Sequence, residues 1–141
     1  MNLTIHLMTS IILGTSLFPA FGWKAVFVLI GGFFIDTDHY LFYLFKEKSF
    51  NLRNAYFYFK DKQNCENVLR NYVLPFHTME ALVVSAVLSL YFEIFLMVTV
   101  GMILHIILDW IYELRNQKNI KVPSIIFWYY KKVYKHTKST F

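Results

Sequence analysis

Four clusters of acidic and histidine residues lie within or at the ends of long apolar segments of this chain. The clusters are His6; Asp36, Asp38 and His39; His77 and Glu80; and His105 and Asp109. Ionisable side chains are costly to bury unpaired in an apolar environment, so they mark functional positions by default. The fold must therefore bring these groups to water or to one another.

The apolar segments predict an all-α integral membrane protein with a single domain over residues 1–141. The chain is 57% hydrophobic and only 16% charged, which is typical of a multi-pass protein rather than a soluble domain. Since roughly 20 apolar residues span a bilayer, we expect a four-helix bundle. The segments that would form it are residues 3–21, 23–45, 76–91 and 94–114.

Two further stretches are expected at the membrane surface. The polar loop of residues 46–75 contains the aromatic run of residues 56–59 beside charges, which predicts a short interfacial helical insertion. The tail of residues 120–141 combines Trp, Tyr and Lys and predicts an interfacial C-terminal helix. A cleaved signal peptide is the alternative for the first segment. A signal normally opens with a cationic region, and no Lys or Arg precedes Lys24.

The basic residues predict the topology. The net charge of +5 is concentrated in residues 46–62 and 118–138, each after an apolar segment, so we expect no nucleic-acid partner. The positive-inside rule places both stretches in the cytoplasm, with both termini and with outer turns at residues 19–24 and near Glu93. A cell (inner) membrane protein with this topology has all four clusters at one level, on the cytoplasmic side.

Helix spacing pairs most of the clustered residues. His105 and Asp109 share a face at i, i+4, as do His77 and Glu80 at i, i+3. Each pair has a structural alternative: a hydrogen bond that locks two helices for the first, and a cap residue near water for the second. His6 is weak alone, because a histidine near a terminus is usually structural, and His136 in the basic tail receives no role.

The second cluster predicts a break in its helix. Asp38 is displaced by about 200° from Asp36 on a helix of 3.6 residues per turn, while Asp36 and His39 share a face. All three side chains reach one ion only if the helix unwinds there, or if one of them acts indirectly.

Imidazole and carboxylate groups without thiolates suit a divalent metal. The single cysteine, Cys65, excludes an internal disulfide and a Cys-rich zinc site, and an ordinary free thiol is its simplest interpretation. We expect one or two ions, Zn²⁺ first, with Mn²⁺ and Fe²⁺ as alternatives. Asp38 and Glu80 are candidates for a general base or a bridging carboxylate. The expected metal ligands are His6, Asp36, His39, His77, His105 and Asp109.

These motifs resemble the LexA-binding, inner-membrane-associated metal-dependent hydrolase family and small relatives of it. The resemblance rests on His6 with Gly14, on Gly-Gly-Phe-Phe-Ile-Asp-Thr-Asp-His over residues 31–39, on Phe-His-Thr-Met-Glu over residues 76–80, and on Gly-x-x-x-His-x-x-x-Asp over residues 101–109. It covers the four apolar segments. Ile35 replaces the usual Pro, Thr78 stands for Ser, no His-Arg pair precedes the third motif, and Glu80 departs from the pattern.

The preferred function is a membrane-bound metal-dependent hydrolase acting on a phosphoester or lipid-like substrate. A bound metal would activate water by lowering its pKa, and the lipid bilayer is the expected partner. One alternative is a metal-ion or proton carrier, which needs polar groups that continue toward the outer face. The other is a non-catalytic membrane protein whose His/Asp pairs only pin its helices.

Overall fold

All regular structure in the described part of the chain is helical, as the sequence predicts. The computed structural model describes residues 3–61, 63–64, 68, 71–115 and 124–130. The first half of the chain forms α1 (Leu3–Phe21), the 3₁₀ turn η1 (Gly22–Phe27), α2 (Val28–Gly32), the 3₁₀ turn η2 (Phe34–Asp36) and α3 (Thr37–Glu47). It is followed by α4 (Leu52–Lys60), the 3₁₀ turn η3 (Pro75–His77), α6 (Met79–Ser89) and α7 (Glu93–Arg115).

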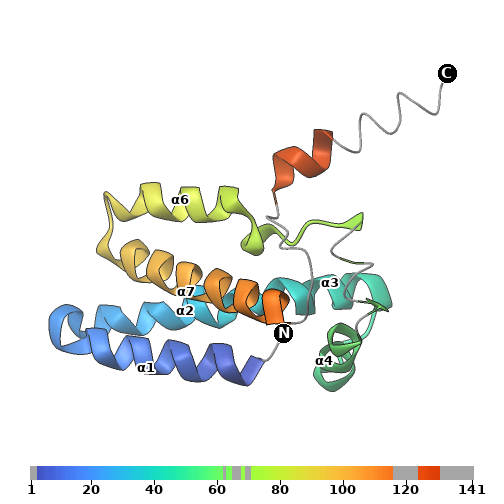
Figure 1. The fold of residues 1–141 in the computed structure, drawn as a ribbon, viewed down its shortest axis with the longest axis horizontal. Coiled ribbons are helices and arrows are strands. Elements are labelled where there is room, and N and C mark those ends of the chain that lie inside the picture. The colour runs from blue at the N-terminus through green and yellow to red at the C-terminus, as the bar shows by residue number, and fades with distance from the viewer. Residues whose placement is uncertain (1–2, 62, 65–67, 69–70, 116–123, 131–141) are drawn as a thin grey trace.

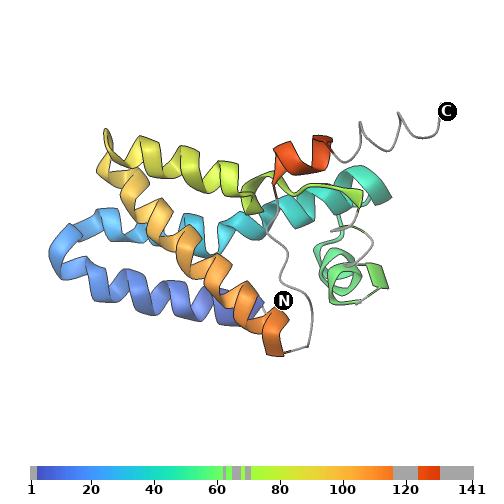
Figure 2. The ribbon, with the colours of Figure 1, turned by 45° about the horizontal axis from the view of Figure 1, so that its top comes forward.

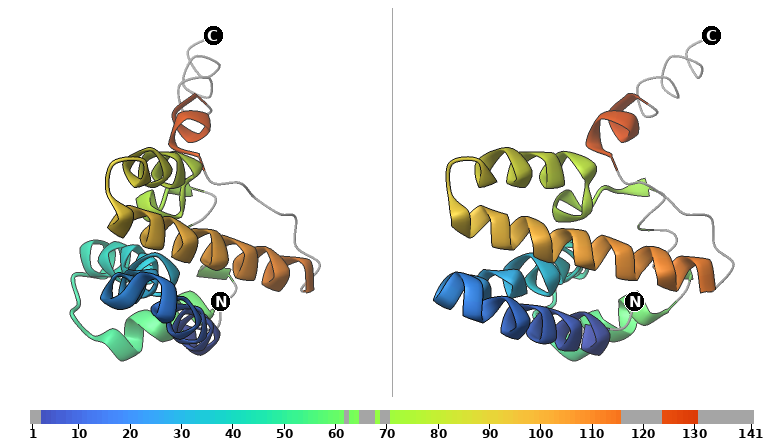
Figure 3. Two further views of the ribbon diagram at one scale, coloured as in Figure 1. Left: turned by 90° about the vertical axis from the view of Figure 1, so that its left-hand side faces the viewer. Right: turned by 60° about the vertical axis from the view of Figure 1, so that its left-hand side comes forward.

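The long helices pack as layers with α7 in the middle. Figure 1 shows α6 on one side of α7 and the α1–α2 pair on the other. In Figure 2, α7 crosses α1 and α2 obliquely, and the end-on view in Figure 3 shows the same order of layers. The expected bundle is therefore formed by α1, by α2 with α3, by α6 and by α7.

The two turns predicted on the outer side lie together at one end of the bundle. The α1–α2 turn and the α6–α7 turn are neighbours in Figure 1. An ion pair joins them, since Lys24 Nζ donates to Glu93 Oε2. The ends of the helices that carry the acidic and histidine residues consequently point the other way.

The middle of the bundle is packed closely enough to require glycine. A Cβ at Gly31 in α2 would lie 2.0 Å from the Val98 carbonyl oxygen in α7, and a Cβ at Gly101 would lie 2.3 Å from the Val28 carbonyl oxygen. Small residues allow helix backbones to approach in this way, and such contacts are typical of helix pairs in membranes. This approach fixes how α2 and α7 are aligned at the site described below.

Several polar side chains are buried between the helices together with apolar ones such as Val28, Met97 and Met102, and many large apolar side chains face outward. The two buried residues of α1 are His6 and Ser10, and the buried residue of α6 is Ser85. Ser85 and Thr99 share a hydrogen bond of 2.8 Å between α6 and α7. Exposed apolar side chains on the same helices include Ile5, Ile12, Phe18, Val83, Val87, Ile103, Ile107 and Ile111.

The stretch Leu3–Glu47 and helix α7 are long and apolar enough to cross a membrane, judged by length and composition. The prediction of a third helix over residues 76–91 is corrected, because these residues do not form one helix. Helix α6 has 11 residues and begins only at Met79. Pro75 opens a 3₁₀ turn, and Thr78 is extended at φ −89° and ψ 153° as the N-cap of α6. His77 and Glu80 therefore do not share a helix face.

The segments expected at the membrane surface do contain helices. The aromatic run of residues 56–59 lies in α4, and residues 125–130 are helical in the tail. Figure 1 places both helices at the end of the molecule opposite the α1–α2 turn. Their position at an interface stays a prediction.

Candidate metal centre

The second segment is broken, but the break lies before the cluster and not within it, because Asp36 and Thr37 keep helical backbone angles. Helix α2 ends at Gly32, Phe33 leaves helical geometry at φ −129° and ψ −49°, and η2 leads into α3. The break leaves the carbonyl of Gly32 free for a partner outside its helix. The junction between η2 and α3 separates Asp36 from Asp38 and His39, and all three side chains are buried.

His105 is held in one tautomer by this break. It is 0% exposed, and its Nδ1 lies 3.0 Å from the Gly32 carbonyl oxygen. A carbonyl oxygen only accepts hydrogen bonds, so Nδ1 carries the proton and donates it. Nε2 is left with its lone pair, which is the arrangement that metal-binding histidines use.

His77 is held in the same tautomer by Asp38. The His77 Nδ1 donates to Asp38 Oδ2 over 2.9 Å, and the backbone N–H of Phe76 donates to the same oxygen over 3.2 Å. In the neutral imidazole, His77 Nε2 then carries the lone pair. A carboxylate that orients an imidazole in this way raises its strength as a ligand.

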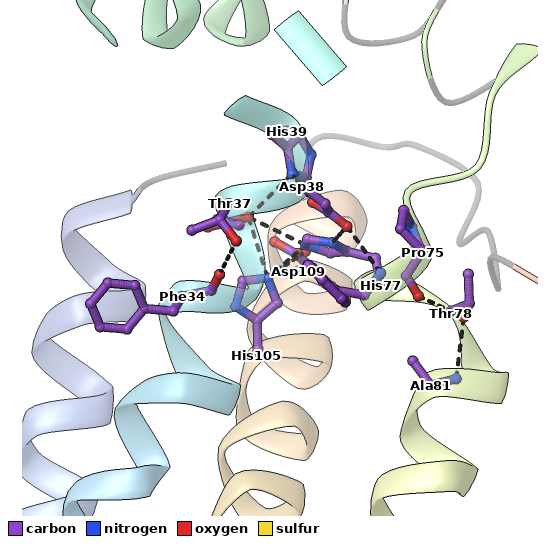
Figure 4. A network of polar contacts seen from close by, with 12 residues as sticks. Phe34, Thr37, Asp38, His39, Pro75, His77, Thr78, Ala81, His105 and Asp109 are labelled. Carbon is purple, nitrogen blue, oxygen red and sulfur yellow. Dashed lines mark hydrogen bonds and ion pairs between the residues drawn. The ribbon is translucent and has the colours of Figure 1, made fainter. Parts of the chain in front are cut away.

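The two imidazole lone pairs converge with a carboxylate oxygen. His77 Nε2 and His105 Nε2 are 3.1 Å apart, and Asp36 Oδ1 lies 3.3 Å from the first and 3.6 Å from the second. Three ligands on a tetrahedral ion with bonds of 2.0–2.1 Å are about 3.4 Å apart. These three buried ligand atoms therefore have the spacing of a metal site (Figure 4).

A second group adjoins the first through His105. His6 Nε2 lies 3.3 Å from Asp109 Oδ1, and Asp109 Oδ2 lies 3.4 Å from His105 Nε2. The His6 ring stacks on the His105 ring with centroids 4.2 Å apart. His6, His105 and Asp109 come from α1 and α7 and also satisfy the spacing of a metal site. The Asp109 side chain is 28% exposed, so the surface is reached on its side.

Asp38, His39 and His77 form a third buried group. Asp38 accepts from His39 Nδ1 over 3.0 Å as well as from His77 Nδ1 and the Phe76 N–H. Its two oxygens are thus occupied in holding two imidazoles. His39 Nδ1 also lies 3.5 Å from Asp36 Oδ1, and its ring packs edge-on against Phe59 of α4.

Buried polar atoms without hydrogen-bond partners concentrate in the first two groups. They include both carboxylate oxygens of Asp36 and the Nδ1 of His6. The imidazole nitrogens near Asp36 are close enough for an ionic contact, but none makes a hydrogen bond to it. Buried polar groups are normally satisfied, and a cation among these atoms would satisfy Asp36.

Glu80 is not brought to these groups. Its carboxylate accepts from Ser124 Oγ over 2.6 Å and from the backbone N–H groups of Ile125 and Ile126 over 3.2 Å each. It therefore caps the tail helix. His136 lies outside the described residues.

Two contributors to the site were not anticipated from the sequence. One is the Gly32 carbonyl, which orients His105. It lies a few residues before the position where the sequence predicts the break. Thr78 accepts from the Ala81 N–H over 3.2 Å and donates to the Pro75 carbonyl oxygen over 2.9 Å, which fixes the turn that carries His77. The Pro-x-x-Thr spacing before an apolar helix was the available signal for this N-cap.

Comparisons with protein-family models, with curated proteins and with solved structures find no match for this chain.

Proposed function

We propose that this chain is a multi-pass membrane protein of the cell (inner) membrane, and that it is a metal-dependent hydrolase acting on a phosphoester or lipid-like substrate. The observation that carries the metal site is the convergence of the lone pairs of His77 Nε2 and His105 Nε2 on Asp36 Oδ1. Two fixed tautomers aim at an unpartnered buried carboxylate. The motif resemblance to inner-membrane metal-dependent hydrolases points the same way.

The inverted distribution of side chains supports the membrane placement. Buried Ser, Thr and His residues face one another inside the bundle, while Ile, Val and Phe cover the outside of α1, α6 and α7. A soluble monomer rarely exposes so much contiguous apolar surface. Lipid tails cover such a surface at no cost, and buried polar side chains then hold the helices together.

We infer one ion with His105 as the shared ligand. An imidazole Nε2 has a single lone pair, so His105 binds one ion, although it belongs to both donor groups. Asp36, His77 and His105 hold this ion, and His6 with Asp109 lies beside it on the other side of His105. Imidazole and carboxylate donors without thiolate fit Zn²⁺, with Mn²⁺ and Fe²⁺ as alternatives.

The surrounding residues have separable tasks. When bound, the metal supplies a water of lowered pKa. Asp38 and the Gly32 carbonyl orient the two imidazoles. Asp38 already accepts three hydrogen bonds and Glu80 is engaged with the tail helix, so neither is placed to take a proton. Asp36 Oδ2, which has no hydrogen-bond partner among the described residues, is the better candidate for the base. The substrate would approach the site from the side of Asp109, whose side chain is partly exposed.

Elemental analysis of the detergent-purified chain tests the metal site. We expect about one divalent ion per chain after metal-replete growth, and loss of that ion in His105→Ala and Asp36→Asn. Ser85→Ala is the matched control, because it removes a buried interhelical hydrogen bond away from the site. Wild-type protein without stoichiometric metal would overturn both the hydrolase and the metal-carrier interpretations.

Assays of the metal-loaded protein then separate the remaining functions. A hydrolase releases phosphate or alcohol from phosphoester lipids in detergent, and removal of the metal with a chelator abolishes this release. A carrier instead moves the ion across sealed vesicles without releasing product. If His105→Ala lowers the stability of the protein but leaves its metal content unchanged, the residues only pin the helices.

A further inference from the structure

A surface of mixed aromatic and cationic side chains lies at the same end of the molecule as the metal centre. Helix α4 packs on α3 through Ala55, which is buried, and through Phe59, whose ring contacts His39 and Phe42. The opposite face of α4 and the preceding turn are exposed. Their exposed apolar side chains are Phe50, Leu52, Tyr56 and Phe57, and Phe45 near the end of α3 is exposed as well.

Cations are positioned over the rings of this surface. Arg53 lies 5.9 Å from the centroid of the Phe57 ring, and Lys60 Nζ lies 5.8 Å from the Tyr56 ring and 6.0 Å from the Phe57 ring. Cation–π contacts hold such groups near aromatic side chains. The positive charges therefore sit beside the most apolar part of the exposed face.

A third cation is fixed where α4 meets α3. Lys46 Nζ donates to the Tyr58 hydroxyl and lies 5.0 Å from the centroid of that ring. The hydrogen bond to Tyr58 raises the pKa of the Lys46 amine above its ordinary value, so the amine stays charged at neutral pH. Glu47 is the acidic group nearest to it, at 3.9 Å.

We propose that the α4 surface, formed by Lys46, Phe50, Arg53, Tyr56, Phe57 and Lys60, binds the headgroup region of anionic lipids. An amphipathic helix with aromatic and basic side chains lies in the plane of a membrane interface and prefers anionic lipids. The exposed rings insert beside the headgroups while the cations contact their phosphates. Because Phe59 packs on His39, the bound interface lies next to the candidate metal centre. This inference rests on the membrane placement of the proposed function and is independent of hydrolysis.

Native mass spectrometry of the full chain in neutral detergent tests the proposal. The protein is titrated separately with phosphatidylglycerol and with phosphatidylcholine. We expect selective binding of phosphatidylglycerol by the wild type, and about a 25-fold loss in Arg53→Gln/Lys60→Gln, from roughly fivefold per cation. The charge-retaining control Arg53→Lys/Lys60→Arg should keep the selectivity, because the contacts to phosphate do not require a particular cation.

Two outcomes would overturn the proposal: equal binding of the two lipids by the wild type, or unchanged selectivity in Arg53→Gln/Lys60→Gln. The metal content of each sample distinguishes this proposal from the previous one. Selective lipid binding by protein that holds no metal would support the α4 surface and refute the metal centre. Metal-loaded protein without lipid selectivity would support the metal centre and refute the α4 surface.

Discussion

Asp36 and Asp38 are two residues apart and have opposite environments. Both are buried, but Asp38 accepts three hydrogen bonds while neither oxygen of Asp36 accepts one. The sequence predicted that both belong to one site and that the helix must break between its ligands. It predicted Asp36 as a ligand and Asp38 as a base or bridging carboxylate, but that Asp38 instead orients His77 depends on the docking of η3 from 38 residues further along the chain.

This difference predicts effects of opposite sign for the two Asp→Asn variants. In metal-free protein, Asp36→Asn removes a buried charge without a hydrogen-bond partner, and its new N–H can donate to a neighbouring imidazole. We expect it to raise the free energy of unfolding by about 1 kcal/mol. Asp38→Asn removes an acceptor from two imidazoles and should lower the free energy of unfolding by about 1–3 kcal/mol.

Chemical unfolding in detergent with excess chelator measures both values. The same variants are then titrated with Zn²⁺, where Asp36→Asn should abolish binding and Asp38→Asn should weaken it about 10- to 100-fold. Equal destabilisation by both substitutions would mean that the Asp36 carboxylate accepts hydrogen bonds from the protein in solution and is not free to bind an ion.

At the scale of elements, the sequence predicted where the acidic and histidine clusters lie more accurately than which residues of each apolar segment are helical. The clusters converge as expected, except for Glu80, because each lies at an end of an apolar stretch on the same side of the bundle. The third helix was misjudged, since the extended Thr78 divides residues 76–91 into a 3₁₀ turn and a shorter helix. The partner of Glu80 could not be foreseen either, because residues 124–126 meet it only after the tail folds back.

The N-cap of α6 gives a prediction about this turn. Thr78→Ala removes the acceptor for the Ala81 N–H and the donor to the Pro75 carbonyl, so we expect a loss of about 1–2 kcal/mol in stability. The turn that carries His77 should loosen, and Zn²⁺ affinity should fall with it. Thr78→Ser keeps the hydroxyl and serves as the control in unfolding and Zn²⁺ titrations. Unchanged Zn²⁺ affinity in Thr78→Ala would separate the cap from the metal site.

The contact between α2 and α7 gives a second prediction at this scale. A Cβ at Gly31 meets backbone atoms of α7, which cannot rotate away, so Gly31→Ala must separate the helices. We expect a loss of about 2–4 kcal/mol and a weaker metal site, since Gly32 would move away from His105. Gly14→Ala is the control: its Cβ comes no closer than 3.2 Å to another residue. Thermal unfolding in detergent should rank Gly31→Ala far below Gly14→Ala.

For the whole molecule, the fold brings the two turns that the charge pattern predicts outside together at one end. The Lys24–Glu93 ion pair joins the two turns expected outside, and the site, α4 and the tail helix lie at the opposite end. Helix α6 constrains this arrangement, because its 11 residues cover about 17 Å at 1.5 Å per residue. The hydrocarbon core is about 30 Å thick, so residues on both sides of α6 must complete a crossing.

Cysteine accessibility in intact cells tests that four-crossing topology. In a Cys65→Ser background, Leu90→Cys places a thiol at an exposed position in the α6–α7 turn, and Phe50→Cys places one between α3 and α4. A membrane-impermeant maleimide should label Leu90→Cys in intact cells and Phe50→Cys only after permeabilisation. Labelling of Phe50→Cys alone in intact cells would place α4 and the candidate metal centre on the outer face, and labelling of both thiols would mean that the bundle does not span the membrane. Protection of Leu90→Cys in intact cells, followed by labelling after permeabilisation, would mean that α6 and α7 do not cross as a hairpin, and the bundle would have to bind the membrane from one side.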